Sequence, residues 1–520
     1  MKGDISLPSS FLKLSPSLLL THPPPFVPPS KPKAPPPSAN FEEAIALTGQ
    51  GSRCQWLVVL TCGFCILCGI SETVGISYLL PAARCDLHLT PADKTLLGGV
   101  TATGMVLSLW PWGLLADSWG RRPVLLTCLS LDTVFGILSS LAPSLNFLLV
   151  CRFFNGLSVS GPSAVSYAFL SEYHGEAARP RAVVTSGLFV ACAVIGLPAT
   201  AWMILTQEIH FPLPWGINLS SWRIYLMMMA LPSLISALLL AVLDESPRFQ
   251  MSKGREKEAL KTLAAMYSAN TGIPKSEYPV KSLQIATIAD EQSKKGGLLS
   301  TVHALWIKIS PLFHMPLLKP LVLCCLLQAG AFLCANGLLM WLPDIFGRIS
   351  ALDIPSGPLC EALTLSSLPS IILSKEGDPC QASVNTSAIA NVLVIGGTVG
   401  IAYILTAILS GFINKRIFLG ILMLVGSAIG FGVAPSSPSS LTLGLTSIFH
   451  ACAGVSITLL GGLIADIFPT QLRAASLSIS LTFGRLGMVG GSTIIGTLLE
   501  LNCESAFHLV AAVALGKYKL

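Results

Sequence analysis

Apolar residues occur along this chain in long runs of about 20 residues, enough to cross the hydrocarbon of a bilayer as a helix. Glycine, proline and charged residues separate the runs. The pattern predicts twelve spans, six before and six after a long polar stretch. They lie near residues 56–82, 95–116, 123–141, 146–170, 182–206, 222–243, 317–346, 389–412, 417–434, 439–465 and 473–496, with a last one from about 505.

Composition supports helices in a membrane. Of 520 residues, 52% are hydrophobic and 11% charged, whereas a soluble domain carries about 25% charge. A transmembrane barrel would show apolar and polar residues in alternation instead of solid runs. The sequence therefore predicts an all-α membrane protein embedded in the lipid bilayer.

Several function classes are excluded. The net charge of +6 does not indicate nucleic-acid binding, because the basic residues lie in short loops between apolar runs. No phosphate-binding GxxxxGK[ST] loop and no nucleophile–base constellation is present, so we expect neither an enzyme nor a cofactor. The metal-like spacing of Cys62, Cys65 and Cys68 lies in an apolar run, where packing is the preferred interpretation over a metal site.

Four regions follow from the pattern. We expect a disordered proline-rich tail at 1–50, a six-helix bundle at 51–243, a linker at 244–316 and a second bundle at 317–520, with an outer loop at 347–388. PxxP spacings between Pro23 and Pro37 could bind an SH3-type partner, although a plain disordered tail is favoured. The last apolar run is about half a span long, so either its flanks complete the helix or the sequence is truncated.

Charge in the loops predicts the orientation. One side carries Arg121, Arg122, Arg179, Lys415 and Arg473 together with the basic linker, and the positive-inside rule makes that side and both termini cytosolic. The glycosylation sequons at Asn218 and Asn385 fall on the other side. Cys360 and Cys380 share the outer loop there and could form a disulfide. The plasma membrane or a secretory or synaptic-type vesicle fits this topology.

A repeat relates the two halves. Glu172 is followed by Arg179, and Asp466 and Arg473 lie 294 residues later in the corresponding loop. Each acid and its arginine could latch two helix ends together while the cytosolic side is closed. A static loop ion pair is the alternative.

One motif has the length and position of a family signature. Gly113-Leu-Leu-Ala-Asp117-Ser-Trp-Gly120-Arg121-Arg122 lies between spans two and three. Its glycines allow a tight turn and close helix approach, Asp117 can pair with an arginine or cap a helix, and Arg121 and Arg122 anchor the turn. It resembles the signature loop of the major facilitator superfamily. The second-half counterpart, Gly411-Phe-Ile-Asn-Lys415-Arg416, lacks the aspartate and the second glycine.

Further segments resemble branches of that superfamily. Ser221-Trp-Arg223 and Glu245-Ser-Pro-Arg-Phe249 are similar to segments of the organic-ion transporters and sugar porters. Phe41 to Gly51 and the large outer loop resemble the synaptic vesicle glycoprotein 2 family. The resemblance implies the twelve-helix major facilitator fold with two six-helix pseudo-repeats. It also implies alternating-access transport of a small organic ion or metabolite, with proton or cation coupling possible; the alternative is a non-transporting membrane glycoprotein that binds partners.

Charges within the spans are the candidate substrate or coupling residues, since charge in hydrocarbon is costly. Glu72 in span one could carry a proton or attract a cation, or instead form a structural hydrogen bond. Arg485 in span eleven matches a position at which, in organic-anion members of the resembling families, arginines attract substrate; pairing with Glu72 is the rival. Arg152 and Asp132 are weaker candidates that could also pair internally.

Overall fold

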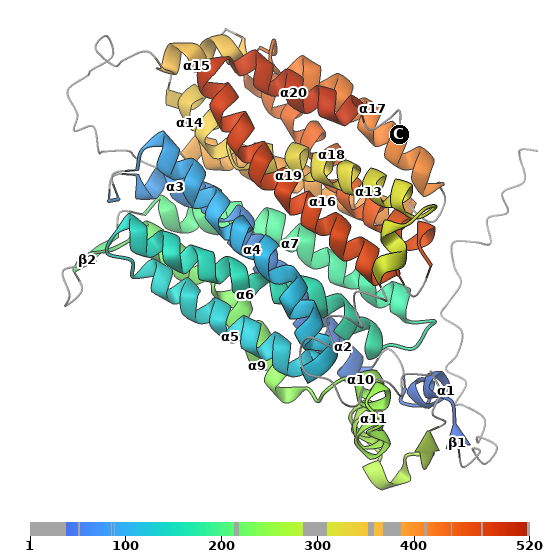
Figure 1. The fold of residues 1–520 in the computed structure, drawn as a ribbon. Helices are drawn as coiled ribbons and strands as arrows, with labels where there is room; N and C mark the ends of the chain where they lie inside the picture. Colours follow the sequence, from blue (N-terminus) through green and yellow to red (C-terminus); the bar gives the residue numbers. More distant parts are fainter. Residues whose placement is uncertain are drawn as a thin grey trace, which may run out of the picture.

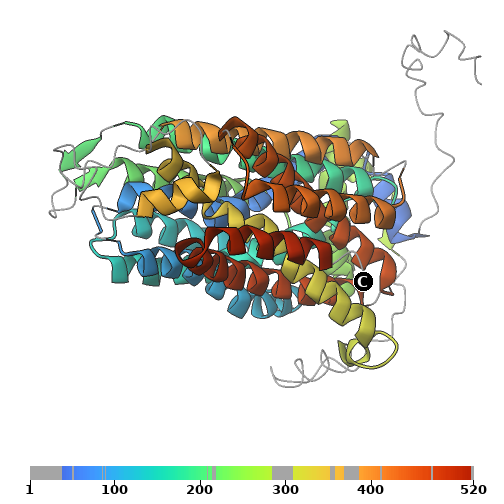
Figure 2. The same cartoon turned by 90° about the horizontal axis from the view of Figure 1, so that it is seen from above.

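The structure is a computed structural model in which each predicted span corresponds to a helix or to consecutive helices. It describes residues 38–49, 52–84, 86–87, 89–207, 209–212, 218–283, 309–351, 358–367, 386–409, 413–437, 439–469 and 472–516. The helices run side by side along one long axis (Figures 1 and 2). Eight stretches of described residues are long and apolar enough to cross a membrane, and a pair bent by 43° at Pro111 makes a ninth.

The first six spans form one side of the bundle in Figure 1 and the last six form the other. The first half contains α2 (Arg53–Val74), α3 (Ile76–Ala83), α4 (Pro91–Trp119), α5 (Arg121–Ser140), α6 (Leu145–Glu172), α7 (Arg179–Leu205), α8 (Ser221–Met229) and α9 (Leu231–Val242). The second contains α13 (Leu318–Phe332), the π-helical turn η5 (Leu333–Gly337), α14 (Leu342–Ala351), α15 (Leu359–Ser367), α16 (Thr386–Leu409), α17 (Lys415–Val433), α18 (Ser439–Ile467), α19 (Arg473–Leu501) and α20 (Cys503–Gly516). The last span is short, as expected: α20 has 14 residues.

Glycines bring pairs of helices close together. An added Cβ at Gly104 of α4 would collide with the Phe153 carbonyl of α6, and one at Gly156 of α6 would collide with the Thr101 carbonyl of α4. Across the two halves, α7 packs against α16 and α4 against α19. At the α7–α16 contact, a Cβ at Gly396 would collide with the Val194 carbonyl. Small residues therefore set both kinds of contact, as such residues do in membrane helices.

The end of the bundle that carries Arg121, Arg179 and Lys415, called the basic end below, has a small additional layer. Strand β1 (Ser38–Ala39) pairs in parallel with β4 (Ser282–Leu283). Helices α1 (Phe41–Ala46), α10 (Pro247–Ser252) and α11 (Glu256–Thr271) lie beside them (Figure 1), with the short 3₁₀ turns η2 (Lys275–Glu277) and η4 (Ser310–Phe313) farther along the chain.

This layer corrects the expected tail boundary at residue 50. Ala44 and Ile45 are buried in the same apolar cluster as Leu263 and Tyr278, and the Tyr278 hydroxyl donates to the Ala44 carbonyl at 2.7 Å. Residues 38–49 are thus packed on the linker, because two apolar side chains of α1 find a buried partner there. The proline-rich segment 23–37 lies outside the described residues.

At the opposite end, strand β2 (His210–Pro212) pairs antiparallel with β3 (Asn218–Ser220). The predicted disulfide is wrong in its partner: Cys360 of α15 bonds to Cys503 at the start of α20, with 5.4 Å between their Cα atoms. Residue 503 begins the last span and so emerges at the same end as the outer loop. Asn218 is exposed, whereas Cys380 and Asn385 lie outside the described residues.

The α4–α6 crossing should tolerate no side chain at Gly156. Gly156→Val should lower the melting temperature of the detergent-purified protein, because overpacking costs about 1–3 kcal/mol. Gly187→Ala is the matched control, since a Cβ there meets no atom within 4 Å. Equal melting of Gly156→Val and the parent protein would contradict the close approach.

The disulfide can be checked by non-reducing peptide mapping. We expect a linked peptide pair containing Cys360 and Cys503, which Cys503→Ser abolishes and Cys380→Ser leaves intact. A Cys360–Cys380 linkage in the parent protein would restore the original expectation.

Candidate functional site

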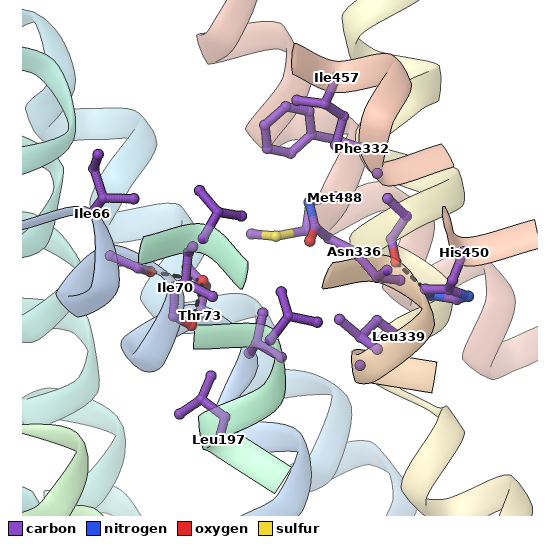
Figure 3. A pocket seen from close by; sticks show the side chains of 18 of the residues that line it. Ile66, Ile70, Thr73, Leu197, Phe332, Asn336, Leu339, His450, Ile457 and Met488 are labelled. Carbon is purple, nitrogen blue, oxygen red and sulfur yellow. Dashed lines mark hydrogen bonds between the residues drawn. The ribbon is translucent and has the colours of Figure 1, made fainter. Parts of the chain in front are cut away.

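A cavity of about 320 Å³ lies between the two halves of the bundle. Helices α2, α3, α4, α6 and α7 line it from the first half, and α13, η5, α16, α18 and α19 from the second. Figure 3 shows side chains from both sides facing one another across it. They include Ile66, Ile70, Thr73 and Leu197, opposite Phe332, Asn336, Leu339, His450, Ile457 and Met488.

Several polar groups of the lining are bonded to backbone carbonyls. The Thr73 hydroxyl donates to the Gly69 carbonyl at 2.8 Å, and the Tyr403 hydroxyl donates to the Gly454 carbonyl at 3.0 Å. His450 Nε2 lies 3.0 Å from the carbonyl of Ala335, in the π-helical turn. An apolar wall with few free polar groups is typical of small-molecule sites.

Arg485 is the cation of this lining. Its residue is 9% exposed, and its Nη1 atom has no hydrogen-bond partner. Neither an ion pair to Arg485 nor a lining carboxylate occurs among the described residues. Gly484 and Gly487 bring α19 against Phe332 and the backbone of Ala329, which places the arginine beside η5. A buried, unpaired guanidinium attracts an anion, because pairing offsets the cost of its desolvation.

Glu72 and Arg152 lie outside this lining, within the first half. Their side chains are fully buried and form an ion pair with 2.6 Å between Arg152 Nη1 and Glu72 Oε2. Arg152 Nε also donates to the Ser139 hydroxyl at 3.1 Å. The alternative in which Glu72 pairs with Arg485 is therefore wrong, because Arg152, inside the same half, occupies the carboxylate.

Asp132 lies in the same buried region as that pair. The Cys68 thiol donates to Asp132 Oδ2 at 3.1 Å, and the Asn155 amide donates to Oδ1 at 2.7 Å. Asp132 does not line the cavity either. Of the four candidate charges, only Arg485 does.

Arg121 is the centre of an ion-pair network at the basic end. Its guanidinium contacts Asp117 at 3.0 Å and Glu172 at 3.1 Å, and donates to the Ala116 carbonyl at 2.9 Å. The loop that presents it turns at Gly120, whose φ of +119° favours glycine. The arginine thus joins the ends of α4 and α6.

Glu245 closes this loop from the end of span six. Its carboxylate accepts hydrogen bonds from the backbone N–H groups of Arg121 and Arg122 at 3.2 Å each, so it caps the start of α5. It also excludes a side chain at Gly120. Burial raises the pKa of Glu245 above its ordinary value. The backbone N–H groups that donate to its carboxylate lower this pKa, but by less than burial raises it. Phe249 stacks on Arg121 with 4.7 Å from the guanidinium carbon to the ring centre.

The second half repeats part of this arrangement. Lys415 contacts Asp466 at 2.7 Å, and both residues lie 294 positions after Arg121 and Glu172. Asn414 accepts from the Arg416 N–H at 3.0 Å, so a side-chain cap replaces the glycine turn.

The expected latch partners are corrected by these contacts. Glu172 binds Arg121 and not Arg179. Arg179 instead contacts Glu42 of α1 at 2.7 Å and donates to the Ser171 carbonyl at 2.9 Å, which turns its guanidinium away from Glu172. The side chain of Arg473 lies outside the described residues. Gly113 has open space around it, so close helix approach does not explain that glycine.

The family model described as Major Facilitator Superfamily matches residues 59–375. The chain belongs to the major facilitator superfamily. It is an integral membrane protein, and the assignment agrees with the expectation that it is not an enzyme.

Sequence relatives point to one branch of the superfamily. The chain is 26% identical to synaptic vesicle glycoprotein 2C of Mus musculus over 332 residues, covering 60% of this chain and 45% of that protein. It is 26% identical to synaptic vesicle glycoprotein 2A of Bos taurus over 334 residues, covering 60% and 44%. The chain thus matches less than half the length of these curated relatives.

Among solved structures, the xylose transporter XylE from E. coli in a partially occluded inward-open conformation has the same fold. The TM-score is 0.62 at 14% identity, over 89% of this chain and 98% of the transporter. At this identity the likeness concerns the fold alone, and it agrees with the twelve-helix major facilitator architecture.

Three residues contribute to the sites of this superfamily member in roles that the sequence patterns did not predict. Asn336 lines the cavity from the π-helical turn, Glu42 holds Arg179, and Glu245 caps α5. The 294-residue offset, applied to Arg121, identifies Lys415 and could have revealed the second ion pair. A π-helical turn has no comparable signal in one sequence.

The partner of Glu172 can be tested by hydrogen–deuterium exchange. Glu172→Gln removes a half-buried charged hydrogen bond to Arg121 worth about 1.5–3 kcal/mol. Exchange in residues 113–122 should then rise about tenfold or more, whereas Arg179→Gln should leave it near the parent value. A larger rise in Arg179→Gln than in Glu172→Gln would favour the Glu172–Arg179 latch.

Proposed function

We propose that this protein is a secondary active or facilitative transporter that moves a small organic anion or metabolite by alternating access. The observation that carries the proposal is Arg485, a buried cation without an ion-pair partner among the described residues, in an apolar cavity between two six-helix halves. A cavity at the boundary of two repeats can open to either side when the halves rock against each other.

The networks at the basic end supply the gate in this proposal. Arg121 with Glu172 and Lys415 with Asp466 each join the start of one span to the end of the next span in the same half. Their rearrangement would accompany opening at that end. We place the basic end and both termini in the cytosol, in a plasma or vesicle membrane, with Asn218 and Asn385 glycosylated on the other side. An SH3-type partner for the proline-rich segment stays part of this proposal.

A second candidate is a non-transporting membrane glycoprotein that binds partners. The observation in its favour is the reduced second loop. Lys415 makes one exposed ion pair, whereas Arg121 makes two ion pairs and also stacks on Phe249. Weaker contacts at the basic end of one half fit a protein that does not alternate between two transport conformations.

Uptake into proteoliposomes tests the proposal. Pools of anionic, cationic and neutral metabolites should show saturable uptake of anions, lost about tenfold or more in Arg485→Ala and partly kept in Arg485→Lys, since one charge-assisted hydrogen bond is worth about 1.5–3 kcal/mol. Arg348→Ala is the matched control, because Arg348 pairs with Asp344 and Glu500 away from the cavity. Anion uptake that is indifferent to Arg485 would overturn the assignment, and partner capture without any flux would favour the second candidate.

A further inference from the structure

The buried polar cluster of the first half has two levels along the bundle axis. On one level, Arg152 bridges Glu72 and Ser139. On the other, Asp132 lies between Cys68 and Asn155. Cys68 and Glu72 are four residues apart on α2, which separates the levels by about one helical turn.

The charges on the two levels do not balance. Glu72 is neutralised by Arg152. Among the described residues, the side chains that hydrogen-bond to Asp132 are those of Cys68, Asn155 and Ser233, all uncharged. Asp132 and Asn155 are both 0% exposed. One guanidinium cannot neutralise two carboxylates, and a buried carboxylate without a paired cation is costly unless it takes up a proton.

The amide of Asn155 suits both protonation states of Asp132. Asn155 Nδ2 lies 2.7 Å from Asp132 Oδ1, while Asn155 Oδ1 has no partner in the part of the chain that the structure describes. Rotating the amide by half a turn places its oxygen at that same distance, where it accepts a hydrogen bond from a protonated carboxyl. When Asp132 is ionised, the original orientation donates to it.

We propose that Asp132 is a proton-binding site of this protein, distinct from the Glu72–Arg152 pair, and that it holds its proton in the conformation described here. When α2, α5 and α6 separate around Asp132, water enters, the proton passes to it, and the carboxylate left behind is hydrated. The groups around Asp132 are Cys68 and Glu72 on α2, Cys128 on α5, Arg152 and Asn155 on α6 and Ser233 on α9.

Helix α2 connects this site to the cavity. Cys68 and Glu72 face the cluster, whereas Gly69 and Thr73, each one position farther along, line the cavity. A change of packing at Asp132 therefore moves the wall of the cavity. The coupling role rests on the proposed transport function, but proton binding itself does not.

Infrared difference spectra of the full chain in lipid nanodiscs, recorded between mildly acidic and strongly alkaline pH, test proton binding directly. We expect a protonated-carboxyl band at neutral pH that Asp132→Asn removes and Glu72→Gln leaves. Asp132→Asn mimics the neutral acid in size and hydrogen bonding, so its melting temperature should equal that of the parent protein. A band that survives in Asp132→Asn, or its absence from the parent protein at neutral pH, would overturn the proposal.

A flux measurement tests the coupling step separately. In proteoliposomes, Asp132→Asn should retain exchange of a labelled anion while losing accumulation driven by an imposed proton gradient. Unchanged proton-driven accumulation in Asp132→Asn would also refute the coupling. If no anion moves in the parent protein but the infrared band depends on Asp132, transport fails and the proton site stands.

Discussion

Hydrocarbon provides no hydrogen-bond partner, and this constraint accounts for the placement of the four candidate charges within the spans, Glu72, Arg152, Asp132 and Arg485. Backbone groups are satisfied within helices. Glu72 and Arg152 form an ion pair with each other, and Asp132 accepts hydrogen bonds from the neutral Cys68 thiol and Asn155 amide. Arg485 remains without an ion-pair partner, and it does so in the cavity between the halves. This unpaired cation thus lies where a ligand can supply the opposite charge.

Ion pairs at the basic end differ from those within the spans, because water is available there as an alternative partner. Ion pairs there are half-buried or exposed and join the start of one span to the end of the next. Water can replace the partner of such a pair when it opens, so these contacts can break and re-form at a lower cost than a pair buried in hydrocarbon. The additional layer around α1 ties the segment before span one to the same end, because Glu42 holds Arg179. In the proposed gate, this contact adds residues from outside the twelve spans.

Sequence alone predicted the fold well, because apolar runs of membrane length and a long signature loop are strong signals. It predicted the chemistry of the loops but not the partners. Glu172 has arginines at both neighbouring helix starts, and only three-dimensional geometry selects Arg121 over Arg179. Cys360 was likewise paired with a cysteine near in sequence, whereas α20 brings Cys503 to it.

The sequence likewise predicted which charges belong to the candidate site's chemistry but not where each of them lies. Helical periodicity places Glu72 on the face of Cys68, but the sequence does not tell which face of α2 lines the cavity, so the absence of Glu72 from the lining needed the structure. The isolation of Arg485 needed it too, since it depends on which acids other helices present. Asn336 reaches the cavity through a local π-helical turn, which the residue pattern does not encode.

The central claim is that the two halves rock around the cavity, so that one end closes as the other opens. Electron–electron distance measurements in nanodiscs test it most directly. One pair of spin labels would be at Val183 and Ile417 near the basic end, and the other at Met203 and Leu441 near the opposite end, all exposed positions. With Cys192 replaced, addition of a transported anion should lengthen one distance and shorten the other. Distances that stay fixed at both ends, or that change in the same direction, would contradict the account.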